Sequence, residues 1–90
     1  MFLTDLKKRI SSGDNVVGAW LSLPSELLVE FYARAGVDYL VIDSEHAIIN
    51  GVVLQRIVRE SQANGIPILV RVGELNGAYI KQILDYGVDG

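Results

Sequence analysis

The stretch "AGVDYLVIDSEH", residues 35–46, decides the fold. Its second residue, Gly36, follows a helix-like segment. The stretch continues through an apolar run and ends on two acids, a hydroxyl and the only histidine of the chain. Glycine just past a helix end accepts the left-handed conformation that closes the last turn. The apolar run at residues 39–42 suits a parallel strand that is covered on both faces. The stretch therefore predicts a helix end, a buried strand and a polar strand end.

The same order of helix-like segment, glycine and apolar segment recurs along the chain. Further glycines that follow a helix-like segment and precede an extended apolar one are Gly13, Gly65 and Gly87. The spacing between successive glycines from Gly36 onward matches one strand plus one helix with short loops. Ser25 and Asn76 are placed to cap helices with apolar residues at helical spacing. The predicted order is a short helix, then strand and helix three times, with residues 87–90 where the next strand would begin.

This order indicates an α/β protein with parallel strands. A doubly wound sheet and the first part of a (β/α)8 barrel both satisfy it. The segment after the first strand, "SLPSE" at residues 22–26, lacks the glycine-rich phosphate turn of a dinucleotide fold. We therefore expect the first three βα units of a TIM barrel after a short N-terminal helix, truncated at the start of strand 4, with residues 1–90 as one partial domain.

Composition excludes several functions. A net charge of −3 argues against nucleic acid as a partner, because phosphate binding needs clustered Lys and Arg. Without cysteine there is no disulfide, thiolate metal site or cysteine nucleophile. The apolar runs are too short to cross a bilayer, and the first residues do not resemble a secretory signal. We expect a cytoplasmic protein with no membrane partner.

Polar residues gather where the predicted strands end, and sites in parallel α/β folds form there. His46 is the acid–base candidate, because imidazole gains or loses a proton near neutrality. Asp43 could accept a hydrogen bond from it and raise its basicity. The alternative is that His46 is an ordinary histidine of a surface loop.

Arg71 directly follows an apolar strand, where a guanidinium needs an anion. Its fork suits a carboxylate or an enolate oxygen, and a structural ion pair with Asp43 or Glu45 is the alternative. Trp20 either walls a substrate pocket or belongs to the core. Three roles are open for Glu45: a metal ligand, a partner of Arg71 or an acid that supports the site from behind.

The sequence lacks the residue patterns that several other catalytic mechanisms require. The lysines lie in the predicted helices rather than inside a barrel, which disfavours a Schiff-base mechanism. The G-x-S-x-G turn of serine hydrolases is absent. One histidine with Asp43 and Glu45 is too few ligands, too crowded on one strand end, for a metal site. Asp38 and Asp89 each follow a Gly-Val pair, and we expect turn roles for both.

Several stretches together resemble the start of the HpcH/HpaI aldolase family, the 2-oxo-acid aldolases of the phosphoenolpyruvate/pyruvate TIM-barrel superfamily. They cover nearly the whole chain in order: "GAWLSLPS" (18–25), "AGVDYLVIDSEH" (35–46), "PILVRV" (67–72) and "IKQILDYGVDG" (80–90). The strand end D-x-E-H followed by the strand end V-R is the specific part. The continuation "HAIIN" is more apolar than the glycine-proline continuation usual in the family.

The resemblance implies a divalent-metal (class II) aldolase that cleaves a 4-hydroxy-2-oxo acid to pyruvate, or a related 2-oxo acid, and an aldehyde. It implies His46 as general base, oriented by Asp43, and Arg71 as the group that binds the 2-oxo acid and stabilises the enolate. Trp20 corresponds to the pocket wall. The metal, Mg²⁺, Mn²⁺ or another transition metal, is expected on ligands beyond residue 90, and the full-length protein is expected to be a homo-oligomer.

Two alternatives stay open. One is a non-catalytic βα module that pairs with the rest of a split barrel. The other is a citryl- or malyl-CoA lyase-type member of the same superfamily. An isolated three-stranded sheet also has unpaired edges, so we expect the free chain to associate, aggregate or remain partly molten, which size-exclusion chromatography checks.

The isolated 90-residue chain is predicted to be catalytically inactive, because it holds half of a site and no metal ligands. The measurement is pyruvate release from a 4-hydroxy-2-oxo acid with Mg²⁺ or Mn²⁺. Clear turnover by the purified chain would contradict the prediction.

Overall fold

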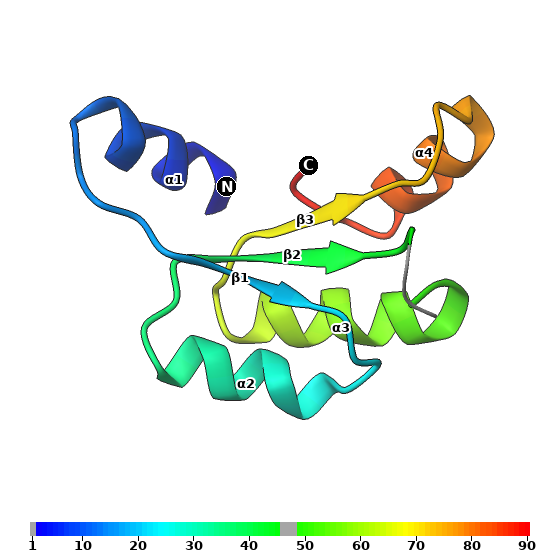
Figure 1. Cartoon of the computed structure of the whole chain (residues 1–90), viewed down its shortest axis with the longest axis horizontal. Helices are drawn as coiled ribbons and strands as arrows, with labels where there is room; N and C mark the ends of the chain where they lie inside the picture. Colours follow the sequence, from blue (N-terminus) through cyan, green and yellow to red (C-terminus); the bar gives the residue numbers. More distant parts are fainter. Residues whose placement is uncertain (1, 46–48) are drawn as a thin grey trace.

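The chain folds as the predicted helix followed by three strand–helix units. The computed structural model describes residues 2–45 and 49–90. The elements in chain order are α1 (Phe2–Ser11), β1 (Gly18–Leu21), α2 (Glu26–Arg34), β2 (Tyr39–Asp43), α3 (Gly51–Ala63), β3 (Ile68–Arg71) and α4 (Gly77–Asp85), as Figure 1 shows. The α/β class and the element order are confirmed. No helix within the described ranges is long and apolar enough to cross a membrane.

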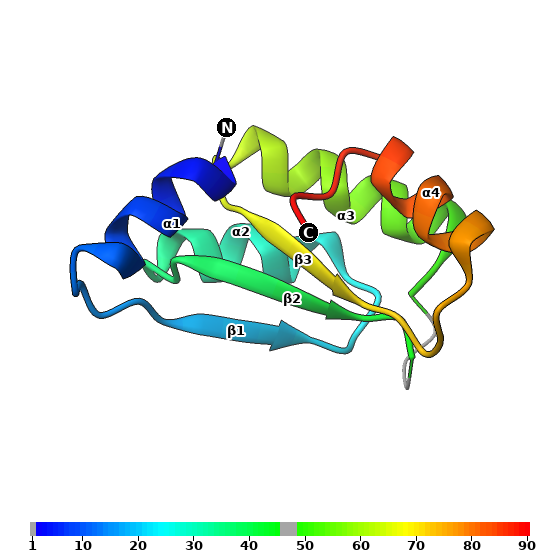
Figure 2. The ribbon, with the colours of Figure 1, turned by 90° about the horizontal axis from the view of Figure 1, so that it is seen from above.

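The three strands form one parallel sheet in the order β1-β2-β3. Because the strands are parallel, their carboxyl ends meet at one edge of the sheet and their amino ends at the opposite edge (Figures 1 and 2). Helices α2 and α3 lie side by side along one face, and α1 lies near the amino ends of the strands. The loops after β2 and β3 therefore leave from the same edge.

The core lies between the sheet and its helices. Leu40 and Ile42 of β2 are fully buried, whereas Tyr39 and Val41, which point to the other face, are only half-buried. Among the described residues, the expected cover of the strands is therefore present on one face only. Helices α2 and α3 cover one face, and the apolar residues of the second face have no comparable cover among the described residues.

The predicted helix ends are confirmed at the glycines. Gly13, Gly36, Gly65 and Gly87 have φ of +87°, +86°, +68° and +97°, a region that other residues rarely adopt. Asn76 caps α4, because its side-chain oxygen accepts a hydrogen bond from the Tyr79 amide at 3.2 Å. Ser25 stands at the N-cap position of α2, but its side chain makes no capping bond, so the predicted interaction is wrong there.

Two aspartates bridge neighbouring strand entrances rather than forming turns. The Asp38 amide donates to the Val17 carbonyl, and the Val17 amide donates to Asp38 Oδ2, both at 2.8 Å. Asp89 repeats the arrangement with Ile68, with both bonds at 2.9 Å. Since the Val70 amide also donates to the Gly90 carbonyl at 2.9 Å, residues 89–90 run along the outer edge of β3.

Gly18 gives the ring of Tyr39 its place on the open face of the sheet. A Cβ built on Gly18 would overlap atoms of that ring. We predict that Gly18→Ala lowers the free energy of unfolding by about 1–3 kcal/mol, the usual cost of overpacking. Urea denaturation followed by circular dichroism measures it.

Gly77→Ala is the matched control, because a Cβ there meets open space. It stands at the first position of α4 and is expected to change stability by less than about 1 kcal/mol. Equal effects of the two substitutions would contradict the packing of Tyr39 on Gly18.

Candidate active site

The predicted strand-end residues share one face of the sheet. Trp20 pairs with Val41, and Asp43 pairs with Arg71. Because side chains alternate between faces along a strand, Val41 and Asp43 point the same way, and so do their partners on β1 and β3. Trp20, Asp43 and Arg71 therefore converge on the open face, at the carboxyl edge of the sheet.

The carboxylate of Asp43 holds the guanidinium of Arg71 side-on. Arg71 Nη2 donates to Asp43 Oδ2 at 2.8 Å, and Arg71 Nε donates to Asp43 Oδ1 at 3.4 Å. Asp43 is 6% exposed, so its charge needs this partner, whereas 40% of the Arg71 side chain remains exposed. The hydrogen bond and charge of Asp43, together with the charge of Glu45, raise the pKa of Arg71. The site thus contains a permanent, oriented cation.

The indole of Trp20 covers one face of the same guanidinium, with Arg71 Cζ 4.6 Å from the ring centroid. Trp20 is 54% exposed, so its assignment to the core is wrong. An indole is the strongest aromatic partner for a cation, and the stack fixes the plane of the guanidinium. Arg71 is therefore held along one edge by Asp43 and across one face by Trp20.

Glu45 takes one of the roles that the sequence left open, as a partner of Arg71. Its Oε1 lies 3.8 Å from Arg71 Nε, and its amide donates to Asp43 Oδ1 at 3.0 Å. Both carboxylates of this strand end thus face one guanidinium. The ion pair expected as an alternative role for Arg71 is confirmed, and such a pair is compatible with a substrate anion that shares the same donors.

The sequence did not reveal that Ser44 binds Arg71. Its amide and its hydroxyl both donate to the Arg71 carbonyl, at 3.1 Å and 2.7 Å. The signal that could have found it is the register. Once Asp43 is paired with Arg71, the next residue of β2 must lie beside the Arg71 carbonyl.

His46 lies outside the described residues, so its predicted approach to Asp43 and Arg71 stays a prediction. In the ranges 2–45 and 49–90, no group of three or more His, Asp or Glu side chains comes together in a way that could hold a metal ion. Asp43 and Glu45 supply oxygen ligands of the kind that Mg²⁺ takes, but both face Arg71. The described residues therefore do not form a metal site by themselves.

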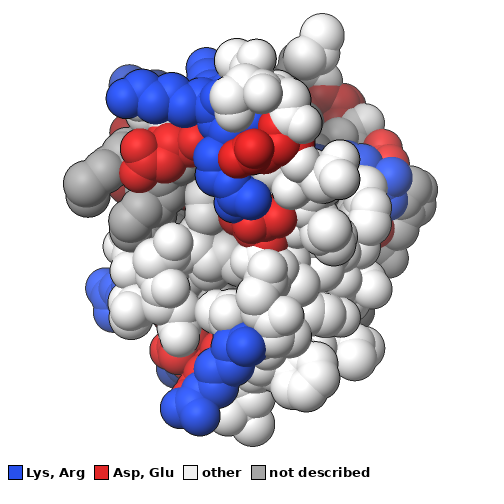
Figure 3. All heavy atoms as spheres, turned by 90° about the vertical axis from the view of Figure 1, so that its left-hand side faces the viewer, with Lys and Arg blue, Asp and Glu red and all other residues white. Residues whose placement is uncertain are grey.

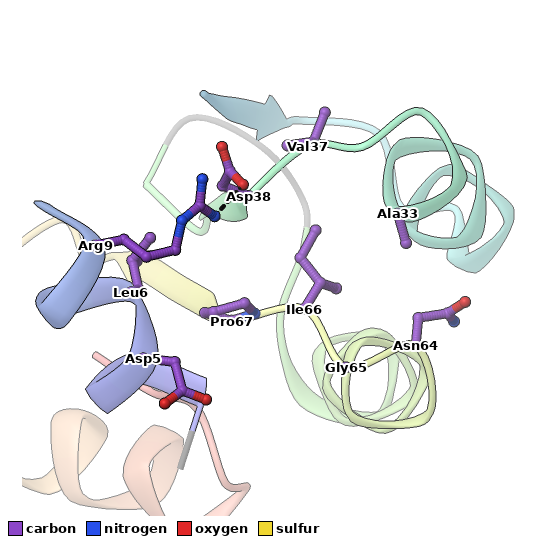
Figure 4. A pocket seen from close by; sticks show the side chains of 10 residues that line it. All are labelled: Asp5, Leu6, Arg9, Ala33, Val37, Asp38, Asn64, Gly65, Ile66 and Pro67. Atoms are coloured by element: carbon purple, nitrogen blue, oxygen red, sulfur yellow. Dashed lines mark hydrogen bonds and ion pairs between the residues drawn. The ribbon is translucent and has the colours of Figure 1, made fainter. Parts of the chain in front are cut away.

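A hollow of about 280 Å³ lies at the opposite edge of the sheet, between α1 and the strand entrances (Figure 4). Arg9 of α1 forms an ion pair with Asp38 there, and a longer one with Asp14 at 3.6 Å. Figure 3, which looks at this end, shows charges of both signs next to one another rather than a patch of one sign. The hydrogen bonds from Arg9 and from the Val17 amide lower the pKa of Asp38. These pairs fasten α1 to the sheet.

Parallel strands whose carboxyl ends carry an oriented cation and two acids place these groups where α/β proteins form their sites. Residues 17–90 match the family model described as HpcH/HpaI aldolase/citrate lyase. The chain belongs to this family, and the resemblance found in the sequence is confirmed.

Curated relatives carry aldolase names. The chain is 35% identical over 88 residues to a hydroxypyruvate/pyruvate aldolase of Paraburkholderia phytofirmans, covering 96% of this chain and 34% of the relative. It is 34% identical over 84 residues to a 2-keto-3-deoxy-L-rhamnonate aldolase of Salmonella gallinarum, covering 90% and 30%. The chain therefore spans about a third of the length of the curated relatives it matches.

Solved structures agree in fold. An HpcH/HpaI aldolase from Desulfitobacterium hafniense superposes with a TM-score of 0.83 at 36% identity, covering 92% of this chain and 32% of that one. The citrate synthase SbnG superposes with a TM-score of 0.84 at 38% identity, covering 92% and 34%. The three strands and four helices thus match part of the aldolase fold.

The Asp38 contact predicts a specific acid sensitivity. Its pKa is lowered on folding, so the carboxylate stabilises the fold above its unfolded pKa of about 3.9, and this contribution is lost as pH falls through the folded value. Asp38→Asn removes the contribution and should flatten the decline in stability below about pH 4. Urea midpoints across this pH range measure it.

Asp85→Asn is the control, because Asp85 is exposed on α4 and has no ion pair within the described part of the chain. It should leave the pH profile close to that of the wild type. Parallel profiles for wild type and Asp38→Asn would refute the role of the Arg9–Asp38 pair.

Proposed function

We propose that this chain is the N-terminal part of a divalent-metal-dependent aldolase. The whole enzyme would cleave a 4-hydroxy-2-oxo acid to pyruvate, or a related 2-oxo acid, and an aldehyde. The names of the relatives support pyruvate-type aldol chemistry, and the chain spans about a third of their length. In this proposal, that third contains the first strand ends of the fold. In this proposal, the remaining strands of an eightfold barrel belong to the part of such a relative that the chain does not span.

The observation that carries the proposal is the held guanidinium of Arg71. Cleavage of the carbon–carbon bond leaves negative charge on the enolate oxygen of the 2-oxo acid. A fixed cation near that oxygen lowers the barrier, because it binds the charge more strongly as the charge develops. Asp43 and Trp20 orient the guanidinium before substrate arrives, so little reorganisation is needed during the reaction.

Base chemistry falls to His46 in this proposal, with Asp43 orienting the imidazole. Asp43 Oδ1 already accepts from the Glu45 amide and from Arg71 Nε, and Oδ2 accepts from Arg71 Nη2. A carboxylate has about four lone-pair sites, so these bonds are compatible with a further donor such as imidazole. Trp20 would form the pocket wall beside the 2-oxo-acid end of the substrate.

The metal ion is proposed to be Mg²⁺, Mn²⁺ or another transition metal. As a Lewis acid it would polarise the substrate carbonyl. Because the described residues do not form a metal site, its ligands are proposed to lie in the part of the longer relatives that this chain does not match. A homo-oligomeric, cytoplasmic enzyme is the corresponding expectation for the whole protein.

A second candidate is chemistry of the citrate type. The family description includes citrate lyase, and the citrate synthase SbnG superposes as well as the aldolase does. A strand-end cation suits a 2-oxo dicarboxylate as well as a 2-oxo monocarboxylate. A non-catalytic module that completes a split barrel is the alternative outside catalysis.

Fragment complementation tests the proposal. The chain is mixed with the carboxyl-terminal two-thirds of the Paraburkholderia relative, and pyruvate release from a 4-hydroxy-2-oxo acid is measured with Mn²⁺ and with chelator. Metal-dependent turnover is expected, and Arg71→Ala should reduce it by about 100-fold or more. Citrate cleavage or synthesis without aldol cleavage would favour the second candidate.

Arg34→Ala is the matched control. Arg34 is exposed on α2 and pairs with Glu30 on the same helix at 2.8 Å, away from the strand ends. Its replacement should leave turnover unchanged. A complemented enzyme that loses activity equally with both substitutions, or one that is never active, would contradict a catalytic role for this strand end.

A further inference from the structure

We propose that Ser44 is a positioning residue for Arg71, and that its hydroxyl sets the orientation in which the guanidinium meets an anionic 2-oxo acid. This inference rests on the proposed function and deepens it, since it concerns how the same site is held. Ser44 is half-buried and directly follows the end of β2.

Two donors of one residue converge on one acceptor. The Ser44 amide donates to the Arg71 carbonyl at 3.1 Å, which continues the ladder of the parallel pair β2–β3. The Ser44 hydroxyl donates to the same oxygen at 2.7 Å. The hydrogen bond from the Ser44 amide alone would continue the strand pairing by one residue. The added hydroxyl bond restricts rotation of the Arg71 peptide plane, because both lone pairs of the carbonyl now have directed partners.

The peptide plane matters because the guanidinium is held at its other end as well. Asp43 binds Nε and Nη2, and Trp20 covers the guanidinium plane. With the side-chain end and the main-chain end both fixed, the torsions between them have few solutions. Loss of the hydrogen bond from the Ser44 hydroxyl to the Arg71 carbonyl would let Arg71 exchange between side-chain conformations while keeping its charge.

Besides Trp20, three consecutive residues hold Arg71. Asp43 binds its guanidinium, Ser44 its carbonyl, and Glu45 lies 3.8 Å from its Nε. The Glu45 amide in turn donates to Asp43 Oδ1, which ties the ends of this tripeptide together. The tripeptide 43–45 therefore contacts Arg71 at both ends, and the Ser44 hydroxyl is the side-chain group that binds its main chain.

The decisive experiment compares Ser44→Ala with wild type by NMR of the Arg71 Nε–H group, using Arg71→Lys to assign the resonance. We expect the Nε–H resonance to shift toward that of exposed arginines and to exchange faster with water in Ser44→Ala. Emission of Trp20, the only tryptophan, is a second readout of the stack on Arg71. The affinity of the complemented enzyme for oxalate, an enolate-like dianion, should fall about three- to tenfold, the usual effect of losing one hydrogen bond.

Matched variants separate positioning from stability. Ser61→Ala removes a buried hydroxyl that donates to the Val58 carbonyl of α3 at the same 2.7 Å, and should leave the Arg71 resonance unchanged. Ser44→Thr retains the hydroxyl and should restore the wild-type signals, whereas Ser44→Val has the same shape without the hydroxyl and should not. The Thr and Val pair decides the question should Ser44→Ala fail to fold.

An unchanged Arg71 resonance and Trp20 emission in Ser44→Ala and Ser44→Val would overturn the inference. Failure of the complemented wild-type enzyme to bind oxalate would count against the proposed function alone. The Arg71 resonance would still decide whether Ser44 positions the guanidinium, because it is measured without ligand.

Discussion

The pairing of the Asp43 carboxylate with the Arg71 guanidinium is the interaction on which the rest of this strand end depends. Asp43 is almost completely removed from water, and a buried carboxylate without a partner would be too costly to keep. Arg71 meets that need from the next strand and at the same time leaves part of its charge exposed. A buried pair of this kind adds little net stability, so its value lies in orientation. The cation is fixed where the sheet opens to solvent.

Most of the fold follows from local patterns in the sequence. Glycines after the helices, short branched apolar runs and the helical spacing of apolar residues depend on neighbours along the chain, and each gave the correct element. The expectation of two covered faces is met on one face only among the described residues, for a non-local reason. Coverage of the second face requires elements that the pattern of the strands alone does not contain.

The sequence predicted those residues of the site that lie at the carboxyl ends of strands. Asp43, Arg71 and Trp20 converge as expected, because parallel strands place their carboxyl ends at one edge. The stack of Trp20 on Arg71 could not be foreseen, since an aromatic residue after an apolar strand looks the same whether it enters the core or covers a cation. The two bonds of Ser44 required the register, which only the folded sheet provides. His46 lies outside the described residues.

Asp38 and Asp89, which bridge neighbouring strands at their amino ends, also constrain how further strands can be added to such a sheet. Asp38 and Asp89 occupy equivalent places, and the intervening entrance, before β3, has Pro67, whose carbonyl accepts from the Leu40 amide at 3.0 Å. Acids on adjacent strands would lie about 4.8 Å apart and repel. Placement at every second strand avoids that repulsion. A sheet that continued this alternation and closed on itself would bring two acids together at the seam unless its strands were even in number.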